Sequence, residues 1–214
     1  MAEETISYSD YAVIDLLDAF ASNEPVPGGG SAAALAGSLG VSLLVMAAGL
    51  PKTRTMAPEE ATDLAEASSR LRPLRESLIE LVDRDSDAYR EVMAALKLPK
   101  ETDAEKAARR QAIQEGMHEA TAVPLEVMRA CQQALAGGVV VARNAYTLAA
   151  SDVGMGIELV AAALRGCGMS IDGNLTSVAD AAYAERARTE RQQLEAEGLA
   201  DAERARALLS AGGS

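Results

Sequence analysis

The sequence predicts an all-α fold, a helical bundle of long antiparallel helices that forms a single domain over residues 1–214. Apolar residues recur at three- and four-residue spacing along most of the chain, and no segment alternates apolar and polar residues as a strand does. Aromatic residues make up only 3% of the chain and tryptophan is absent, so the core must consist of aliphatic side chains and many alanines. Alanine is the best helix former, which favours the same fold class.

Two helices of different character are predicted before residue 51. Ser7 and Asp10 can cap the first, which should end near Ala21, because residues 23–30 supply two prolines and three glycines. The second covers residues 32–50, which carry no charge over 19 positions, a length close to that of a membrane span. Small residues recur there at every fourth position, so another helix can approach closely. We therefore expect a buried helix of a soluble protein and no membrane association.

The next two helices are predicted to be long. The third should run over about 58–96, with leucines on one side and charges on the other. Thr102, followed by Glu105 three residues later, forms a capping-box pattern that should open the fourth. This helix should kink or break at Pro124 and end at the glycine pair 137–138.

The segment after this glycine pair is less regular. Residues 139–142 are apolar and fit either a helix or an extended segment. Ser151 is a good N-cap residue for a further helix. That helix should end near Arg165, where two glycines follow within three residues.

The last helical region is predicted to start at Asn174 or Thr176. From about residue 184 to 214 the chain forms a charged helical tail, with Arg and Glu at three- and four-residue spacing. Gly198 should interrupt it. This tail is predicted to be either a solvated helix or a segment that contacts a partner.

Charge and cysteine content narrow the function classes. The net charge of −12 argues against nucleic acid as a partner, because phosphate binding needs a basic field, and it favours solubility. The first ten residues are acidic and polar, unlike a secretion signal. Cys131 and Cys167 lack metal-ligand spacing, and the single His118 cannot complete a zinc site with them. We expect two reduced, buried thiols, no metal and a cytoplasmic protein.

The most distinctive stretch is Pro25-Val26-Pro27-Gly28-Gly29-Gly30-Ser31, directly before the uncharged helix. Consecutive glycines leave backbone N–H groups unshielded, and the helix start adds free donors and partial positive charge. Together they could bind an anion or a carbonyl without a basic side chain. Alternatively, the glycines only permit a tight turn and close packing. The stretch is neither a P-loop nor a dinucleotide fingerprint.

This run resembles the formiminotransferase-cyclodeaminase C-terminal family, which includes stand-alone bacterial methenyltetrahydrofolate cyclohydrolases. The likeness extends along nearly the whole chain, in the family's order and spacing. It includes an acidic stretch, the segment after it, an apolar proline step and two later motifs: LVDRDSDAY at 81–89, VMAALKLPK at 92–100, Val123-Pro124-Leu125, Ser151-Asp152-Val153-Gly154 and Asn174-Leu175.

The resemblance implies an all-α homodimer that acts on a tetrahydrofolate derivative and requires no cofactor. A cyclohydrolase opens 5,10-methenyltetrahydrofolate with water to give 10-formyltetrahydrofolate. A cyclodeaminase closes 5-formimidoyltetrahydrofolate and releases ammonia. Because the methenyl carbon is already electrophilic, the enzyme needs to orient water, accept its proton, deliver a proton to the leaving nitrogen and stabilise the cation.

Three residues are predicted to act in catalysis. Lys52 is the only lysine in the first 96 residues and stands where the family tends to carry lysines. Asp152 should lie in the first helical turn, where the helix dipole stabilises a carboxylate. Asp83 shares a helix face with Asp87, and Asp85 should lie on another. Each has an ordinary alternative: a solvated lysine, a helix cap or a solvated acidic face.

A second set is predicted to bind substrate: Pro27, Gly28, Gly29, Gly30, Ser31, Asn144 and Ser151. The amide of Asn144 suits a pterin edge, although Asn is also common in turns for local reasons.

Two departures from the family pattern touch these contacts. The family has a Gly-Asn and a further Asn shortly before its Ser-Asp pair, whereas residues 144–150 read NAYTLAA here. It also often carries a basic cluster after the second helix, whereas residues 51–54 read PKTR. The absence of a formiminotransferase segment favours the cyclohydrolase. The cyclodeaminase and a non-catalytic helical dimer of the same fold are the alternatives.

Overall fold

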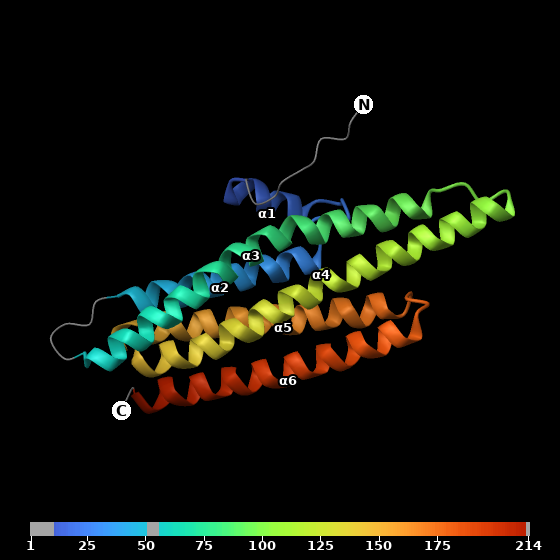
Figure 1. Cartoon of the computed structure of the whole chain (residues 1–214). Coiled ribbons are helices and arrows are strands. Elements are labelled where there is room, and N and C mark those ends of the chain that lie inside the picture. The colour runs from blue at the N-terminus through green and yellow to red at the C-terminus, as the bar shows by residue number, and fades with distance from the viewer. Residues whose placement is uncertain (1–10, 51–55, 213–214) are drawn as a thin grey trace.

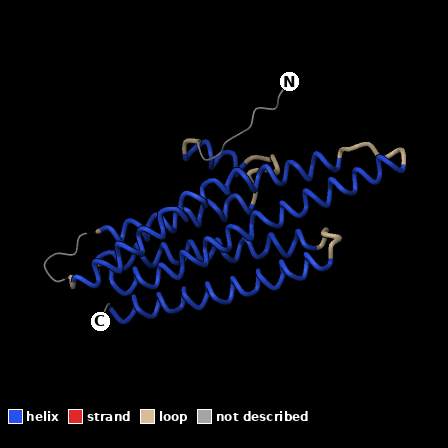
Figure 2. The backbone as a smooth tube through the Cα atoms, viewed as in Figure 1, coloured by secondary structure: helices blue, strands red, loops and turns tan. Residues whose placement is uncertain are grey.

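The computed structural model describes residues 11–50 and 56–212, and in these residues every regular element is helical (Figures 1 and 2). The prediction of an all-α bundle is confirmed. The elements are α1 (Val13–Ala21), α2 (Gly29–Gly49), α3 (Pro58–Leu96), α4 (Asp103–Asn144), the 3₁₀ turn η2 (Thr147–Ala149), α5 (Ala150–Leu175) and α6 (Ala181–Gly212).

The five long helices form two layers. In Figure 1, α3, α4 and α6 lie in front of α2 and α5, and consecutive helices run antiparallel. Helix α4 contacts α2, α3, α5 and α6, while α2 packs between α3 and α5. The hairpin of α3 and α4 extends beyond the other helices (Figure 2). Short α1 lies outside the bundle and reaches the core through Leu16 and Phe20.

The predictions for the first helices are largely confirmed. Helix α3 has the predicted bounds, and the capping box opens α4, with Thr102 Oγ1 accepting from the N–H of Glu105 at 3.2 Å. Helix α1 ends at Ala21 as expected but begins at Val13, with Ala12 at its N-cap. Ser7 and Asp10 lie outside the described residues.

The predicted end of α4 is wrong. The helix passes through Pro124 and through the glycine pair 137–138 to Asn144, so residues 139–142 are helical. A β-carbon at Gly138 would overlap the Cδ1 atom of Ile157 on α5. This glycine is therefore a point of close helix packing. Glycine costs about 1 kcal/mol relative to alanine in a helix interior, and the contact with α5 outweighs that cost.

The predicted boundaries of α5 and α6 are also wrong. Ala149 is the N-cap of α5, and Ser151 lies exposed within its first turn. The helix continues past residue 165 to Leu175. Asp180 caps α6, where its side chain accepts from the N–H groups of Ala182 and Tyr183 at 2.9 and 3.0 Å.

The charged tail is an integral part of the bundle. Helix α6 is continuous through Gly198. A β-carbon added at Gly198 would lie only 2.6 Å from the Cδ2 atom of Leu164 on α5. Four alanines on its inner face are buried: Ala184, Ala187, Ala202 and Ala205. The helix buries this alanine face against the bundle, where Arg191 also packs against Gly168 of α5, and the glycine again marks a close approach.

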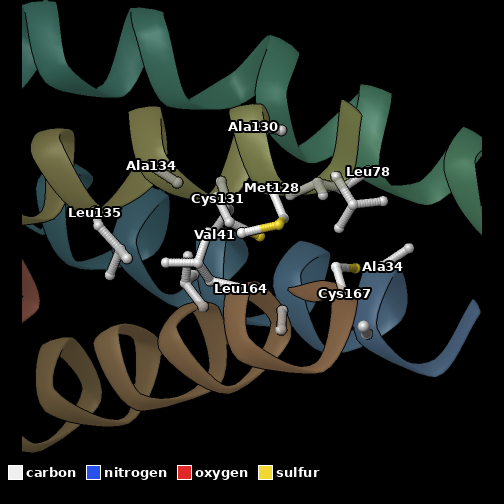
Figure 3. Close-up of a cluster of buried hydrophobic side chains, with 14 of the residues drawn as sticks. Ala34, Val41, Leu78, Met128, Ala130, Cys131, Ala134, Leu135, Leu164 and Cys167 are labelled. Atoms are coloured by element: carbon white, nitrogen blue, oxygen red, sulfur yellow. The ribbon is translucent and has the colours of Figure 1, made fainter. Parts of the chain in front are cut away.

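Small residues bring the layers close together. The Gly40 and Gly156 backbones of α2 and α5 meet directly, since an added β-carbon on Gly156 would lie 2.9 Å from the Gly40 carbonyl oxygen. Both cysteines lie in this aliphatic core (Figure 3). Burial raises the pKa of the Cys131 thiol to about 12, so it stays protonated at neutral pH.

The bundle leaves one apolar face uncovered. By length and composition α2 and the segment Thr147–Leu175 could cross a membrane, but the bundle buries 50% and 44% of their most apolar windows. Core helices of soluble proteins pass the same test. Large apolar side chains are exposed on both helices, Leu39 and Met46 on α2 and Met155 and Met169 on α5, and on α5 they lie beside exposed charges such as Glu158 and Arg165.

Helix contact at Gly156 should dominate the stability of the bundle. Gly156→Ala should lower the free energy of unfolding by about 2 kcal/mol, because the added methyl meets backbone that cannot move alone. Gly154→Ala, two residues earlier in α5, meets only an ordinary contact at 3.8 Å and should stabilise by up to about 1 kcal/mol. Urea unfolding of both variants checks this. Equal effects would contradict the packing argument.

Candidate functional site

The glycine-rich run forms the start of α2. Helix α2 begins at Gly29, and its N-cap residue, Gly28, has no side chain to bond the free N–H groups. Pro27, Gly30 and Ser31 are buried, whereas Gly29 is exposed. The helix therefore begins inside the run, one residue after the prolines end, with its unshielded donors near α3.

Asp85 of α3 fills the space over this helix start. Ser31 Oγ donates a hydrogen bond of 2.9 Å to Asp85 Oδ2 and lies 3.1 Å from Ser86 Oγ. A β-carbon at Gly30 would overlap the Asp85 carboxylate. Glycine is required there, because only a residue without a side chain lets the carboxylate approach the first turn of α2.

The surroundings of Asp85 make it the carboxylate of interest. Burial raises its pKa, while hydrogen bonds from the hydroxyl and the backbone of Ser31 act in the opposite direction. Carboxylates with such shifts are frequent at functional sites. Sequence reasoning placed Asp85 away from the site, although its position after Leu78, Leu81 and Val82 continues the buried face of α3 at helical spacing.

The other acidic residues of this stretch face different surroundings. Asp83 is partly buried and two residues from Asp85, so its side chain points to another side of α3. Asp87 bonds Arg90 at 2.6 Å within the same helix. The role predicted for Asp83 remains a prediction, and the Ser31 hydroxyl bonds Asp85.

The remaining candidates lie at the opposite end of α2. Asn144, at the end of α4, is only 5% exposed and donates from Nδ2 to Asp63 Oδ2 at 3.1 Å. Asp152 is partly buried in the first turn of α5, beside exposed Ser151. Lys52 lies outside the described residues.

One chain therefore holds two separate groups of candidates. Helix α2 has 21 residues and separates them by about 30 Å, at 1.5 Å per residue. One group comprises the run 27–31 with Asp85. The other comprises Asn144, Ser151 and Asp152. The structure does not bring the two groups together within a single chain.

Two cavities lie near the second group. The larger, about 580 Å³, is lined by ten residues, of which Leu50 and Met56 lie between α2 and α3 and the others in these helices: Ala48, Gly49, Leu50, Met56, Ala61, Leu64, Ala65, Ser68, Ser69 and Arg72. The smaller, about 190 Å³, lies between the end of α4, η2, α5 and the end of α6, where Arg143 and Tyr146 contribute to its wall. Within residues 11–50 and 56–212, no cluster of three His, Cys, Asp or Glu side chains could hold a metal ion.

The raised pKa of Asp85 gives a pH-dependent contribution to stability. Its pKa in the folded state lies above the unfolded value near 4. The folded protein therefore loses stability as the pH rises from about 4, because the carboxyl group ionises more readily in the unfolded chain. Asp85→Asn cannot ionise and keeps an acceptor for Ser31. Relative to the wild type, its free energy of unfolding should therefore rise between pH 3.5 and 7, as measured by urea titrations. A difference that is constant with pH would contradict this.

Known proteins match both the sequence and the fold. The pattern of the formiminotransferase-cyclodeaminase family matches residues 12–193. A methenyltetrahydrofolate cyclohydrolase of Methylorubrum extorquens is 36% identical over 188 residues, which cover 88% of this chain and 90% of that protein. A formimidoyltransferase-cyclodeaminase of Gallus gallus is 29% identical, and the match covers 86% of this chain but only 34% of that longer protein.

The structural comparison agrees on the fold. The crystal structure of formiminotetrahydrofolate cyclodeaminase from Thermotoga maritima has a TM-score of 0.84 to this chain at 20% identity, covering 94% of this chain and 97% of that one. Together with the sequence match along nearly the whole chain, these findings assign the chain to the formiminotransferase-cyclodeaminase family.

Proposed function

We propose that this chain hydrolyses 5,10-methenyltetrahydrofolate to 10-formyltetrahydrofolate. The observation that carries the proposal is the 36% identity, over 90% of its length, to a protein named as a methenyltetrahydrofolate cyclohydrolase. The match covers 88% of this chain as well, so the likeness is not confined to one segment. The substrate is a folate derivative, and the reaction needs neither metal nor cofactor.

Asp85 extends the predicted catalytic set of Lys52, Asp152 and Asp83. A partly buried carboxylate stabilises the cationic amidinium of the substrate better than a solvated one, because water screens it less. Its raised pKa also makes it a stronger proton acceptor for the attacking water. Ser31 holds the carboxylate in place, and the adjacent Ser86 hydroxyl limits the positions open to Ser31.

A homodimer through the uncovered apolar face would complete this site. Leu39 lies at the middle of α2 and is 55% exposed, and Met169 on α5 is 70% exposed. A two-fold axis that passes near Leu39 at right angles to α2 makes α2 antiparallel to its copy and uses the same patch on both chains. The run 27–31 and Asp85 of one copy then approach the Asn144 and Asp152 end of the other.

The wider setting follows from charge and composition. A chain of net charge −12 does not suit nucleic acid, and the apolar helices α2 and α5 suit a protein interface of a cytoplasmic dimer. The matched relatives in animals carry cyclodeaminase names, so closure of 5-formimidoyltetrahydrofolate with release of ammonia is the second candidate activity. A non-catalytic dimer of the same fold is the third.

Absorbance of methenyltetrahydrofolate measures the activity directly. The wild type should accelerate its decay saturably in a buffer that is a weak general-base catalyst. Asp85→Asn should lower kcat roughly a hundredfold, as expected for loss of a general base, and Lys52→Ala and Asp152→Ala by roughly tenfold or more. Asp87→Asn, the same change at a carboxylate that pairs with Arg90, is the control.

The outcome separates the three candidate functions. No acceleration by the wild type, with ammonia released from 5-formimidoyltetrahydrofolate, would replace the cyclohydrolase by the cyclodeaminase. Inactivity on both would favour the non-catalytic dimer. Wild-type rates in Asp85→Asn would remove Asp85 from the mechanism.

Charge on the apolar face should abolish dimerisation. Leu39→Glu and Met169→Glu each place a charge where a second copy would bury it, so the molar mass from light scattering should fall from twice the chain mass of 22.2 kDa to that of one chain. Leu98→Glu, at an exposed leucine after α3, is the control. A wild-type protein that is already monomeric at micromolar concentration contradicts the interface.

A further inference from the structure

The larger cavity is a groove between the end of α2 and the first half of α3. The α3 wall consists of residues at positions 61, 64, 65, 68, 69 and 72, which share one face of the helix. These positions extend over about 16 Å at 1.5 Å per residue. Five of the ten lining residues are alanine or serine and a sixth is glycine, so small residues line most of this cavity of about 580 Å³.

One end of the groove carries an arginine that forms no ion pair within the described part of the chain. Arg72 is the charged residue of the lining, and no ion pair joins it to any described residue. Glu76, one turn after Arg72, lies 3.6 Å from Arg75, and Glu66, nearly two turns before it, lies 3.8 Å from Arg70. In a chain of net charge −12 an unpaired guanidinium is a local attraction for an anion.

The neighbouring residues complete a carboxylate site. Ser68 and Ser69 lie one turn before Arg72 and also line the groove. Their two hydroxyls can donate to the same anion as the guanidinium. The other end of the groove is formed by Leu50 and Met56, where α2 ends. The last carbonyls of α2 carry partial negative charge there, and the N-terminus of α3 at the same end carries the opposite partial charge. Arg72 is therefore the charge that distinguishes the two ends of the groove.

We propose that this groove binds the aminobenzoyl-glutamate part of the folate, with a glutamate carboxylate on Arg72. The inference rests on the proposed folate substrate. The ring lies along the small side chains between the helices, and the cationic methenyl end points toward Leu50, at the same end of the bundle as Asn144 and Asp152. The guanidinium of Arg72 matches the anionic tail of the substrate, and the end of the groove without a charged side chain receives the one-carbon unit.

Binding of two non-reacting ligands tests this. Calorimetry compares 5-formyltetrahydrofolate with 5-formyltetrahydropteroate, which lacks the glutamate. Arg72→Gln should weaken binding of the first about tenfold, as expected for loss of a charge-assisted hydrogen bond, and leave binding of the second unchanged. Arg72→Lys should restore part of the loss. Arg70→Gln, on the same helix but outside the groove, should bind both ligands as the wild type does, and thermal melts confirm that the variants fold.

Every other result overturns the groove assignment. Equal weakening of both ligands, no weakening of either, or a wild type that binds neither ligand all contradict it. If the wild type hydrolyses methenyltetrahydrofolate while Arg72→Gln binds normally, the groove inference fails alone. If binding depends on Arg72 but no turnover occurs, the groove inference stands and the proposed activity fails.

Discussion

Close packing of α2 between α3 and α5 is the constraint on which the rest of the structure depends. Gly40 and Gly156 meet with no side chain between their backbones. An aliphatic core with few rings can be compact only if helices approach this closely, since alanine and glycine fill little space. The same composition leaves α2 apolar all round, so one of its faces stays uncovered while the other lies in the core.

The position of α2 also determines the chemistry at its N-terminus. Because α3 runs antiparallel against it, Asp85 comes to lie over Gly30 and accepts from Ser31. The glycine run was interpreted either as a binding site or as a turn that permits close packing. In the structure it permits a close approach, and the group that approaches is a carboxylate. Burial raises the pKa of this carboxylate, so it is a stronger proton acceptor than the solvated carboxylates of this acidic protein.

Carboxylates of this acidic chain neutralise many of its arginines, but not all of them. On α3, α4 and α6 the arginines pair with carboxylates across helices, as Arg84 does with Glu119 and Glu126, and Arg129 with Glu190. Exposed pairs of this kind contribute at most about 1 kcal/mol each. Among the described residues Arg72 has no such pair, and it lies in the larger groove, so an anionic ligand can be recognised locally despite the overall negative field.

The sequence by itself determined the fold class, the bounds of α3, the capping box of α4 and the family, because helical periodicity, caps and an ordered set of motifs are local properties. Only the tertiary structure decided where helices continue through Gly138 and Gly198, because there the contact with α5 outweighs local propensity. It also decided that Asp85 lies beside Ser31, 54 positions earlier in the chain, and that Asn144 bonds Asp63. Such pairings depend on how helices far apart in sequence pack together, which no local spacing encodes.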